Sequence, residues 1–148
     1  MLAKTGWYSR GYLPHFDVPD LVQFITFRLA DSIPLSALTR IEEGIKLGPQ
    51  ERREAERRNR LNKWLDRGYG SCWLGKPEVA ACVEQALLDT DGEQCLLLGW
   101  CIMPNHVHVL AELSDDTPLS QLVKKWKGVS AVKSNRLLGR TGNFWFRE

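Results

Sequence analysis

The sequence predicts an α+β fold, in which an antiparallel sheet carries helices mainly on one face. Residues 21–29 are rich in β-branched and aromatic side chains, and residues 95–103 form a short continuous apolar run, so both are expected to be strands. Residues 106–113 follow the second strand after Pro104-Asn105, a turn signal, and the two are expected to pair as an antiparallel hairpin. Between and after these strands, apolar residues recur at helical spacing.

Four helices are expected, and they cover residues 32–44, 50–67, 78–89 and 119–138. Pro34 suits the first turn of the first helix, while Gly68 and Gly139 follow the second and the fourth, where glycine commonly ends a helix. A short strand is predicted at 144–146. This order corresponds to a split β-α-β arrangement, a ferredoxin-like or RRM-like palm with an antiparallel sheet.

The composition is that of an ordinary globular domain, and the sequence argues against several classes of protein. The 148 residues suggest one domain, 43% of them are hydrophobic, and no apolar stretch is long enough to span a membrane. The N-terminus has no apolar core of a secretory signal. The four cysteines lack any Cys-x-x-Cys pair, which argues against a zinc ribbon and favours reduced, buried thiols.

Two histidines, His106 and His108, stand one residue apart in an apolar stretch. Side chains at i and i+2 of a strand point to the same face, so both imidazoles are expected to project together. Two imidazoles on one face can hold one divalent cation. The alternative is a pair of polar residues on a half-exposed strand. Asn105 is expected to orient the turn that presents His106.

The predicted helix at 119–138 and the residues after it contain a local excess of positive charge. A segment of this kind is either a phosphate-binding surface or a solvated helix face, and the sequence leaves both open. Trp126, at helical spacing from Leu122 and Val129, is expected to be a core residue rather than a platform for base stacking. The candidate DNA-binding residues in this segment are Lys124, Lys125, Lys127, Lys133, Arg136 and Arg140.

The string Met103-Pro104-Asn105-His106-Val107-His108 resembles the HUH motif of single-tyrosine transposases, in which an apolar residue separates two histidines. Other segments resemble, in the same order, parts of the REP-associated tyrosine transposases, a branch of the IS200-like transposases. These parts are the N-terminal signature, the helix after the hairpin and the loop and strand that follow it, which correspond here to residues 8–16 with 23–29, 119–127 and 138–145.

The resemblance implies an enzyme that cuts and rejoins single-stranded DNA beside a hairpin formed by a palindromic repeat. A tyrosine hydroxyl would attack the scissile phosphate, giving a 5′-phosphotyrosine link and a free 3′-OH. His106 and His108 would hold Mg²⁺ or Mn²⁺, which neutralises charge that develops on the phosphate. Arg10 is a further candidate for a phosphate contact. The resemblance also implies a bacterial or archaeal protein in the cytoplasm, close to the nucleoid, that acts as a monomer or a homodimer.

In relatives the nucleophilic tyrosine and a further metal ligand lie on a helix beyond the Phe-Trp strand. The sequence ends at Glu148, before that helix, and its tyrosines, Tyr8, Tyr12 and Tyr69, occupy other positions. We therefore expect residues 1–148 to form a single domain of this type without that helix, to bind metal weakly and to cleave poorly or not at all. Two alternatives stay open, a truncated, inactive module that binds DNA hairpins, and a small metal-binding protein unrelated to DNA.

Overall fold

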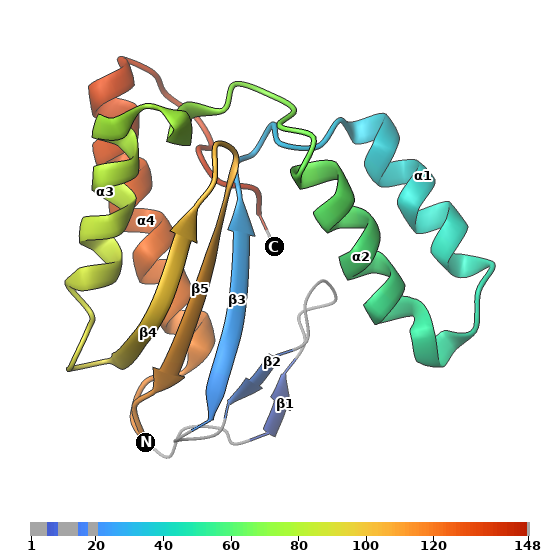
Figure 1. Cartoon of the computed structure of the whole chain (residues 1–148), viewed down its shortest axis with the longest axis horizontal. Helices are drawn as coiled ribbons and strands as arrows, with labels where there is room; N and C mark the ends of the chain where they lie inside the picture. The colour runs from blue at the N-terminus through green and yellow to red at the C-terminus, as the bar shows by residue number, and fades with distance from the viewer. Residues whose placement is uncertain (1–5, 9–14, 18–20, 148) are drawn as a thin grey trace.

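The computed structural model describes residues 6–8, 15–17 and 21–147 of the chain. Its main sheet is antiparallel and has the strand order β3-β5-β4, formed by β3 (Val22–Arg28), β5 (His106–Leu113) and β4 (Cys95–Ile102). A separate pair of short antiparallel strands, β1 (Gly6–Tyr8) and β2 (His15–Asp17), precedes it (Figure 1). The α+β class with an antiparallel sheet is confirmed.

The helical elements fall into two groups. The helices α3 and α4 pack against the sheet, and we call the sheet with these two helices the palm (Figure 1). A helical hairpin, here called the arm, extends from β3 beyond the edge of the sheet, and it contains α1, η1 and α2. The bounds are α1 (Leu35–Lys46), η1 (Gln50–Arg52), α2 (Arg53–Leu65), η2 (Trp73–Gly75), α3 (Pro77–Leu88) and α4 (Leu119–Leu138).

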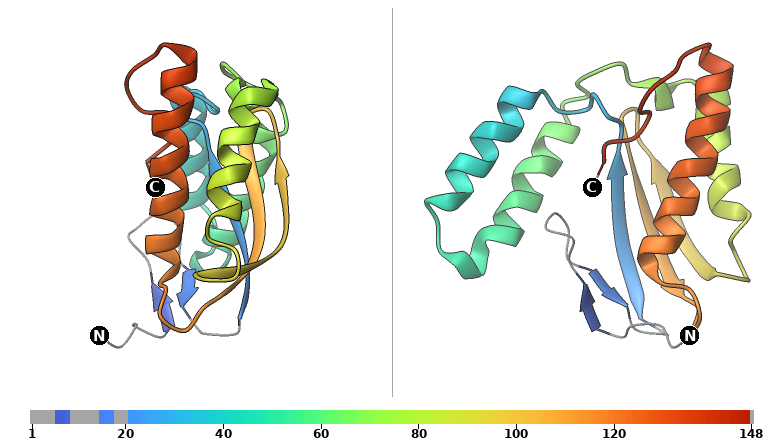
Figure 2. Two further views of the ribbon diagram at one scale, coloured as in Figure 1. Left: turned by 90° about the vertical axis from the view of Figure 1, so that its left-hand side faces the viewer. Right: turned by 180° about the vertical axis from the view of Figure 1, so that it is seen from behind.

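One face of the sheet is buried by helices, and we call it the helix face. Seen from behind, α4 and α3 lie across this face (Figure 2). Alternate residues of each strand point into the shared core, such as Phe27 of β3 and Val107 of β5. Trp126 of α4 stacks on Phe27 with ring centroids 6.4 Å apart, and its indole nitrogen donates to the Thr90 hydroxyl at 2.9 Å. Trp126 is 1% exposed, so its prediction as a core residue is confirmed.

The arm has a smaller core of its own. Ile33, Ala37 and Leu65 are buried there, and Leu61 and Trp64 pack against them. Across the helix pair, the Arg57 guanidinium donates two hydrogen bonds to the Glu42 carboxylate, at 2.8 and 3.0 Å. The arm is therefore held together by contacts between two helices that are neighbours in sequence.

Several predicted bounds need correction. The first helix continues past Gly44 to Lys46, and a Cβ added at Gly44 would meet the guanidinium of Arg60. Residues 50–67 form a 3₁₀ turn followed by α2 rather than one helix. The predicted strand at 144–146 is reduced to a single bridge between Leu29 and Trp145. By contrast, the bounds of β5 and α4 match the predictions.

Two further expectations can be compared with the structure. The four cysteines are free, as predicted, but Cys95 alone is buried and Cys101 is exposed, because β4 turns Cys101 away from the helix face. Within the described part of the chain, no helix has the length and the apolar character needed to cross a membrane.

Candidate functional site

The two histidines lie on the central strand of the sheet, on the face opposite to the helices, which we call the histidine face. The ladder pairs His108 with Thr26 of β3 and with Cys101 of β4, so these three side chains share that face. His106 begins β5 directly after the turn that contains Pro104 and Asn105. The strand geometry expected from the sequence thus brings the two rings together.

The rings approach each other closely. The Nε2 atoms of His106 and His108 are 3.1 Å apart, and the ring planes are at 84°. Two nitrogen ligands at right angles around one cation, each about 2.1 Å from it, would be about 3.0 Å apart. The two nitrogens therefore have the spacing of neighbouring ligands of one ion.

The orientation of each ring is fixed by a hydrogen bond at its second nitrogen, Nδ1. His106 Nδ1 is 2.8 Å from Asn105 Oδ1, and His108 Nδ1 is 2.8 Å from the Thr26 hydroxyl. Phe24 stacks on the His108 ring with centroids 5.2 Å apart and planes at 20°. Hydrogen bonds of this kind from the second nitrogen orient metal-binding histidines in many proteins.

The electrostatic surroundings keep the pair neutral. His106 is 2% exposed, and burial, followed by the neighbouring His108, lowers its pKa to about 4. Burial also lowers the pKa of His108. The carboxylate of Asp66, which follows α2 at the base of the arm, acts to raise the pKa of both histidines and so opposes part of this effect. At neutral pH both rings carry lone pairs that can bind a cation.

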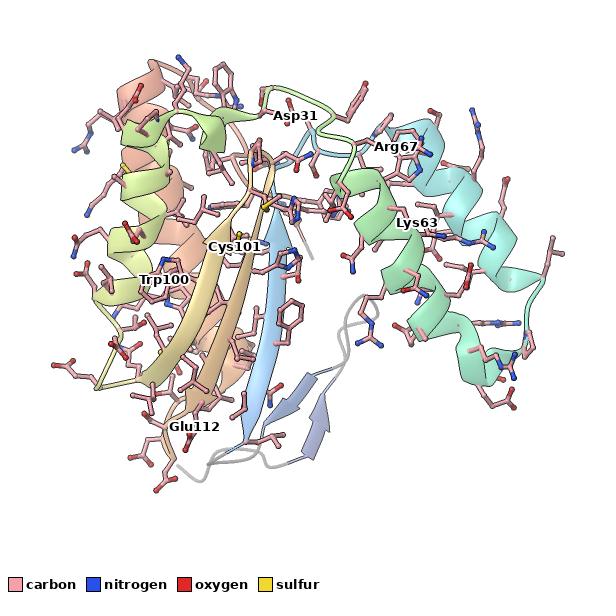
Figure 3. The ribbon with its side chains drawn as sticks, in the orientation of Figure 1. Asp31, Lys63, Arg67, Trp100, Cys101 and Glu112 are labelled. Atoms are coloured by element: carbon pink, nitrogen blue, oxygen red, sulfur yellow. The ribbon has the colours of Figure 1, made fainter. Side chains whose placement is uncertain are left out.

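No group of three or more His, Cys, Asp or Glu side chains suited to a metal ion occurs among the residues that the structure describes. The pair would therefore hold a cation with two nitrogens, and its other positions would be left to water or to oxygens of a bound substrate. Cys101, labelled in Figure 3 near the end of β4, donates instead to the Met103 sulfur at 3.5 Å.

The candidate DNA-binding residues of α4 lie on the other side of the palm. Because α4 packs on the helix face, its cations are separated from the histidines by the sheet. Lys124, Lys125, Lys133 and Arg136 are exposed. Lys127 donates to the Phe146 carbonyl at 2.7 Å, and Arg140 donates to Asn135 at 2.7 Å. Arg10 lies outside the described residues.

Two further exposed cations belong to the end of α2 and the segment that follows it, at the base of the arm. Figure 3 labels Lys63, which lies on α2, and Arg67, which lies two residues after the end of α2, and both are exposed. Arg67 lies over the Trp64 ring, 4.4 Å from its centroid. Arg28, opposite His106 in the ladder, is buried and stacks on Phe146 at 3.6 Å.

Sequence reasoning identified the two histidines but missed two of their partners. Thr26 and Phe24 meet His108 through the register of β3 against β5, which no local pattern reveals. Asn105 was assigned to the turn, and in the structure it contacts the His106 ring directly. The sequence offered one local sign of this contact, because the amide side chain of Asn105 directly precedes a histidine that is a candidate metal ligand.

Comparison with known proteins gave one match. The family model described as "Transposase IS200 like" matches residues 57–147, more than half of the chain. No curated protein and no solved structure matches. The matched range begins within α2 and covers both histidines, β4, β5, α3 and α4.

Proposed function

Since the chain belongs to the family of IS200-like transposases, we propose that its histidine pair serves metal-dependent cleavage and rejoining of single-stranded DNA. His106 and His108 would hold Mg²⁺ or Mn²⁺. The observation that carries this proposal is the pair of Nε2 atoms 3.1 Å apart on the histidine face. When bound, the cation would supply positive charge beside a non-bridging oxygen of the scissile phosphate.

The residues around the pair suit a single-stranded substrate. The Phe24 ring is 66% exposed and lies flat against His108, so an unpaired base could stack on its free face. In this proposal a tyrosine hydroxyl attacks phosphorus, a phosphotyrosine bond forms as the bond to the 3′ oxygen breaks, and that oxygen takes up the proton that the hydroxyl loses. The proposal assigns this role to none of the tyrosines that the structure describes. Tyr69 is not offered for this role, because it lies between α2 and η2, whereas the resemblance places the nucleophile on a helix beyond the Phe-Trp strand.

The substrate in this proposal is DNA that carries a hairpin, as in the REP-associated branch of the family. The exposed cations of α4 and of the arm would contact phosphates of the paired stem. If about four such contacts form, log K should fall with log salt at a slope of about −3.6.

The test uses the complete chain with a labelled repeat-type hairpin and Mn²⁺, on native and denaturing gels. The proposal expects Mn²⁺ binding that is lost in His106→Ala and His108→Ala but kept in Glu43→Gln, an exposed control on α1. A DNA-linked band that depends on His106 would support cleavage. Unchanged Mn²⁺ affinity in both histidine variants would contradict the metal role.

A second candidate function is DNA binding without cleavage. It is favoured by the separation of the α4 cations from the histidine pair by the sheet. It expects salt-dependent retardation of the hairpin on the native gel, with no covalent band in Mn²⁺. Loss of retardation in Lys124→Ala/Lys125→Ala, with His106→Ala unaffected, would place the binding surface on α4.

A further inference from the structure

A continuous row of hydrogen-bonding groups crosses the histidine pair from the base of the arm to the edge of the sheet. It begins at the Tyr69 carbonyl, which accepts from Asn105 Nδ2 at 3.1 Å. Asn105 Oδ1 then meets His106 Nδ1, the two Nε2 atoms meet each other, and His108 Nδ1 meets the Thr26 hydroxyl. Each member therefore constrains where the next one carries its proton.

At the Tyr69 end of this row, the donor and the acceptor of each hydrogen bond are fixed. A carbonyl oxygen only accepts, so the amide nitrogen of Asn105 must face Tyr69 and its oxygen must face the ring. That oxygen also only accepts, so the proton of His106 has to be on Nδ1. The Nε2 atom of His106 is left with a lone pair directed at His108.

The Thr26 end has no fixed direction, because a hydroxyl can donate as well as accept. With no cation present, Nε2 of His106 needs a donor, and His108 supplies it as an Nε2–H while its Nδ1 accepts from Thr26. A shared cation needs lone pairs on both Nε2 atoms. The proton of His108 then has to be on Nδ1, where the Thr26 hydroxyl can turn and accept it.

We propose that Asn105 is a positioning residue that fixes His106 in the metal-accepting tautomer, while Thr26 allows His108 to change tautomer when a cation binds. The second half rests on the proposed function, and the first half does not. Asn105 is fully buried and its other bond goes to Tyr69, so the base of the arm sets the orientation of the first ligand. The two histidines thus differ in role, although both belong to one strand.

The test is long-range proton–nitrogen NMR of both rings in the complete chain, at neutral pH, first with a chelator and then with Zn²⁺ as a diamagnetic probe. The metal-free spectrum should show His106 protonated on Nδ1 and His108 protonated on Nε2. Zn²⁺ should move the His108 proton to Nδ1 and leave that of His106 in place. A metal-free His106 protonated on Nε2 would overturn the role of Asn105.

Variants separate orientation from general stability. Asn105→Asp keeps an acceptor for the ring and should retain the His106 tautomer, whereas Asn105→Leu removes it and should give a mixture of tautomers. Partners of this kind commonly change metal affinity 10- to 100-fold, so Asn105→Leu should weaken Zn²⁺ binding by about that factor. If Asn105→Leu does not fold, Asn105→Asp still decides, because a changed His106 tautomer in that variant would contradict the proposal.

Thr26 is tested by a similar pair of substitutions. Thr26→Ser keeps the hydroxyl and should retain the Zn²⁺-dependent change in His108, while Thr26→Val should lose affinity because the Nδ1–H then has no acceptor. Thr39→Val, which removes an exposed hydroxyl on α1, is the control. If Zn²⁺ and Mn²⁺ fail to bind while the His106 tautomer is as expected, the proposed metal function and the role of Thr26 are overturned, and that of Asn105 is supported.

Discussion

The palm and the arm are stabilised in different ways. In the palm, three strands and two helices far apart in sequence share one core, in which Phe27, Val107 and Trp126 are almost fully buried. In the arm, two successive helices enclose a few side chains and are joined at the surface by an ion pair. From this contrast we expect the palm to unfold as one cooperative unit and the arm to open without it.

The histidine pair lies where these two regions meet. Asn105 and His106 belong to the palm, yet Asn105 is bonded to Tyr69 in the segment that leaves α2. A second connection joins Asp31 before the arm to Ser71 after it, since the Ser71 N–H donates to the Asp31 carboxylate at 2.9 Å. The site is therefore built on the region with the larger core and oriented by a segment next to the region with the smaller one.

The largest effect is expected for Trp126→Ala in the palm. Removing a buried indole leaves a cavity between α4 and the sheet, and changes of this kind cost about 3–5 kcal/mol in the free energy of unfolding. Urea denaturation followed by circular dichroism measures this cost. Amides of β5 should become less protected, while amides of the arm, which exchange through local opening, should change little. A loss below about 1 kcal/mol would show that α4 contributes little to the palm.

The second largest effect is expected in how the free energy of unfolding depends on pH, because His106 lies where the palm and the arm meet. The pKa of His106 is lowered from 6.5 to about 4 in the folded protein, so the unfolded chain binds more protons between these values. Stability is therefore lost as the pH falls through this window, and by pH 4 the loss amounts to about 3 kcal/mol. In a chelating buffer, the wild type should lose more stability than His106→Gln between pH 7 and pH 4.5. Equal losses would contradict this.

A smaller and local effect is expected for Leu65→Ala in the arm. Leu65 is 3% exposed and packs in the small arm core, so its truncation should cost about 2 kcal/mol. Hydrogen exchange should speed up in α1 and α2 and stay unchanged in β5. Leu47→Ala, at a side chain that is 91% exposed, is the matched control. Equal acceleration in β5 would mean that the palm and the arm open together.

This comparison also explains how far the sequence predicts the molecule. The hairpin of β4 and β5 was predictable because an apolar run, a Pro-Asn turn and an alternating run follow each other directly. The end of α4 was predictable because Gly139 adopts a left-handed conformation there, with φ 62°. Both signals are local, and local signals also marked His106 and His108.

The parts that were missed depend on contacts over long sequence separations. Thr26 lies 82 residues from His108, and the carbonyl that orients Asn105 lies 36 residues away. Neither partner belongs to a recognisable local pattern. The basic helix was predicted correctly as a helix, but its position behind the sheet follows from which of its faces packs against Phe27.

The smallest effect is expected for the ion pair that links the two helices of the arm. The hydrogen bond from Arg57 is the main reason why the pKa of Glu42 lies below its ordinary value. Both groups are partly exposed, with side-chain exposures of 20% and 48%, so solvent screens much of their attraction. Glu42→Gln should therefore cost the arm only about 0.5 kcal/mol, and added salt should reduce that cost. Glu43→Gln is its neighbour on α1 and serves as the control. Hydrogen exchange of α1 at low and high salt measures the difference, and an effect that also reached β5 would show that arm contacts stabilise the palm.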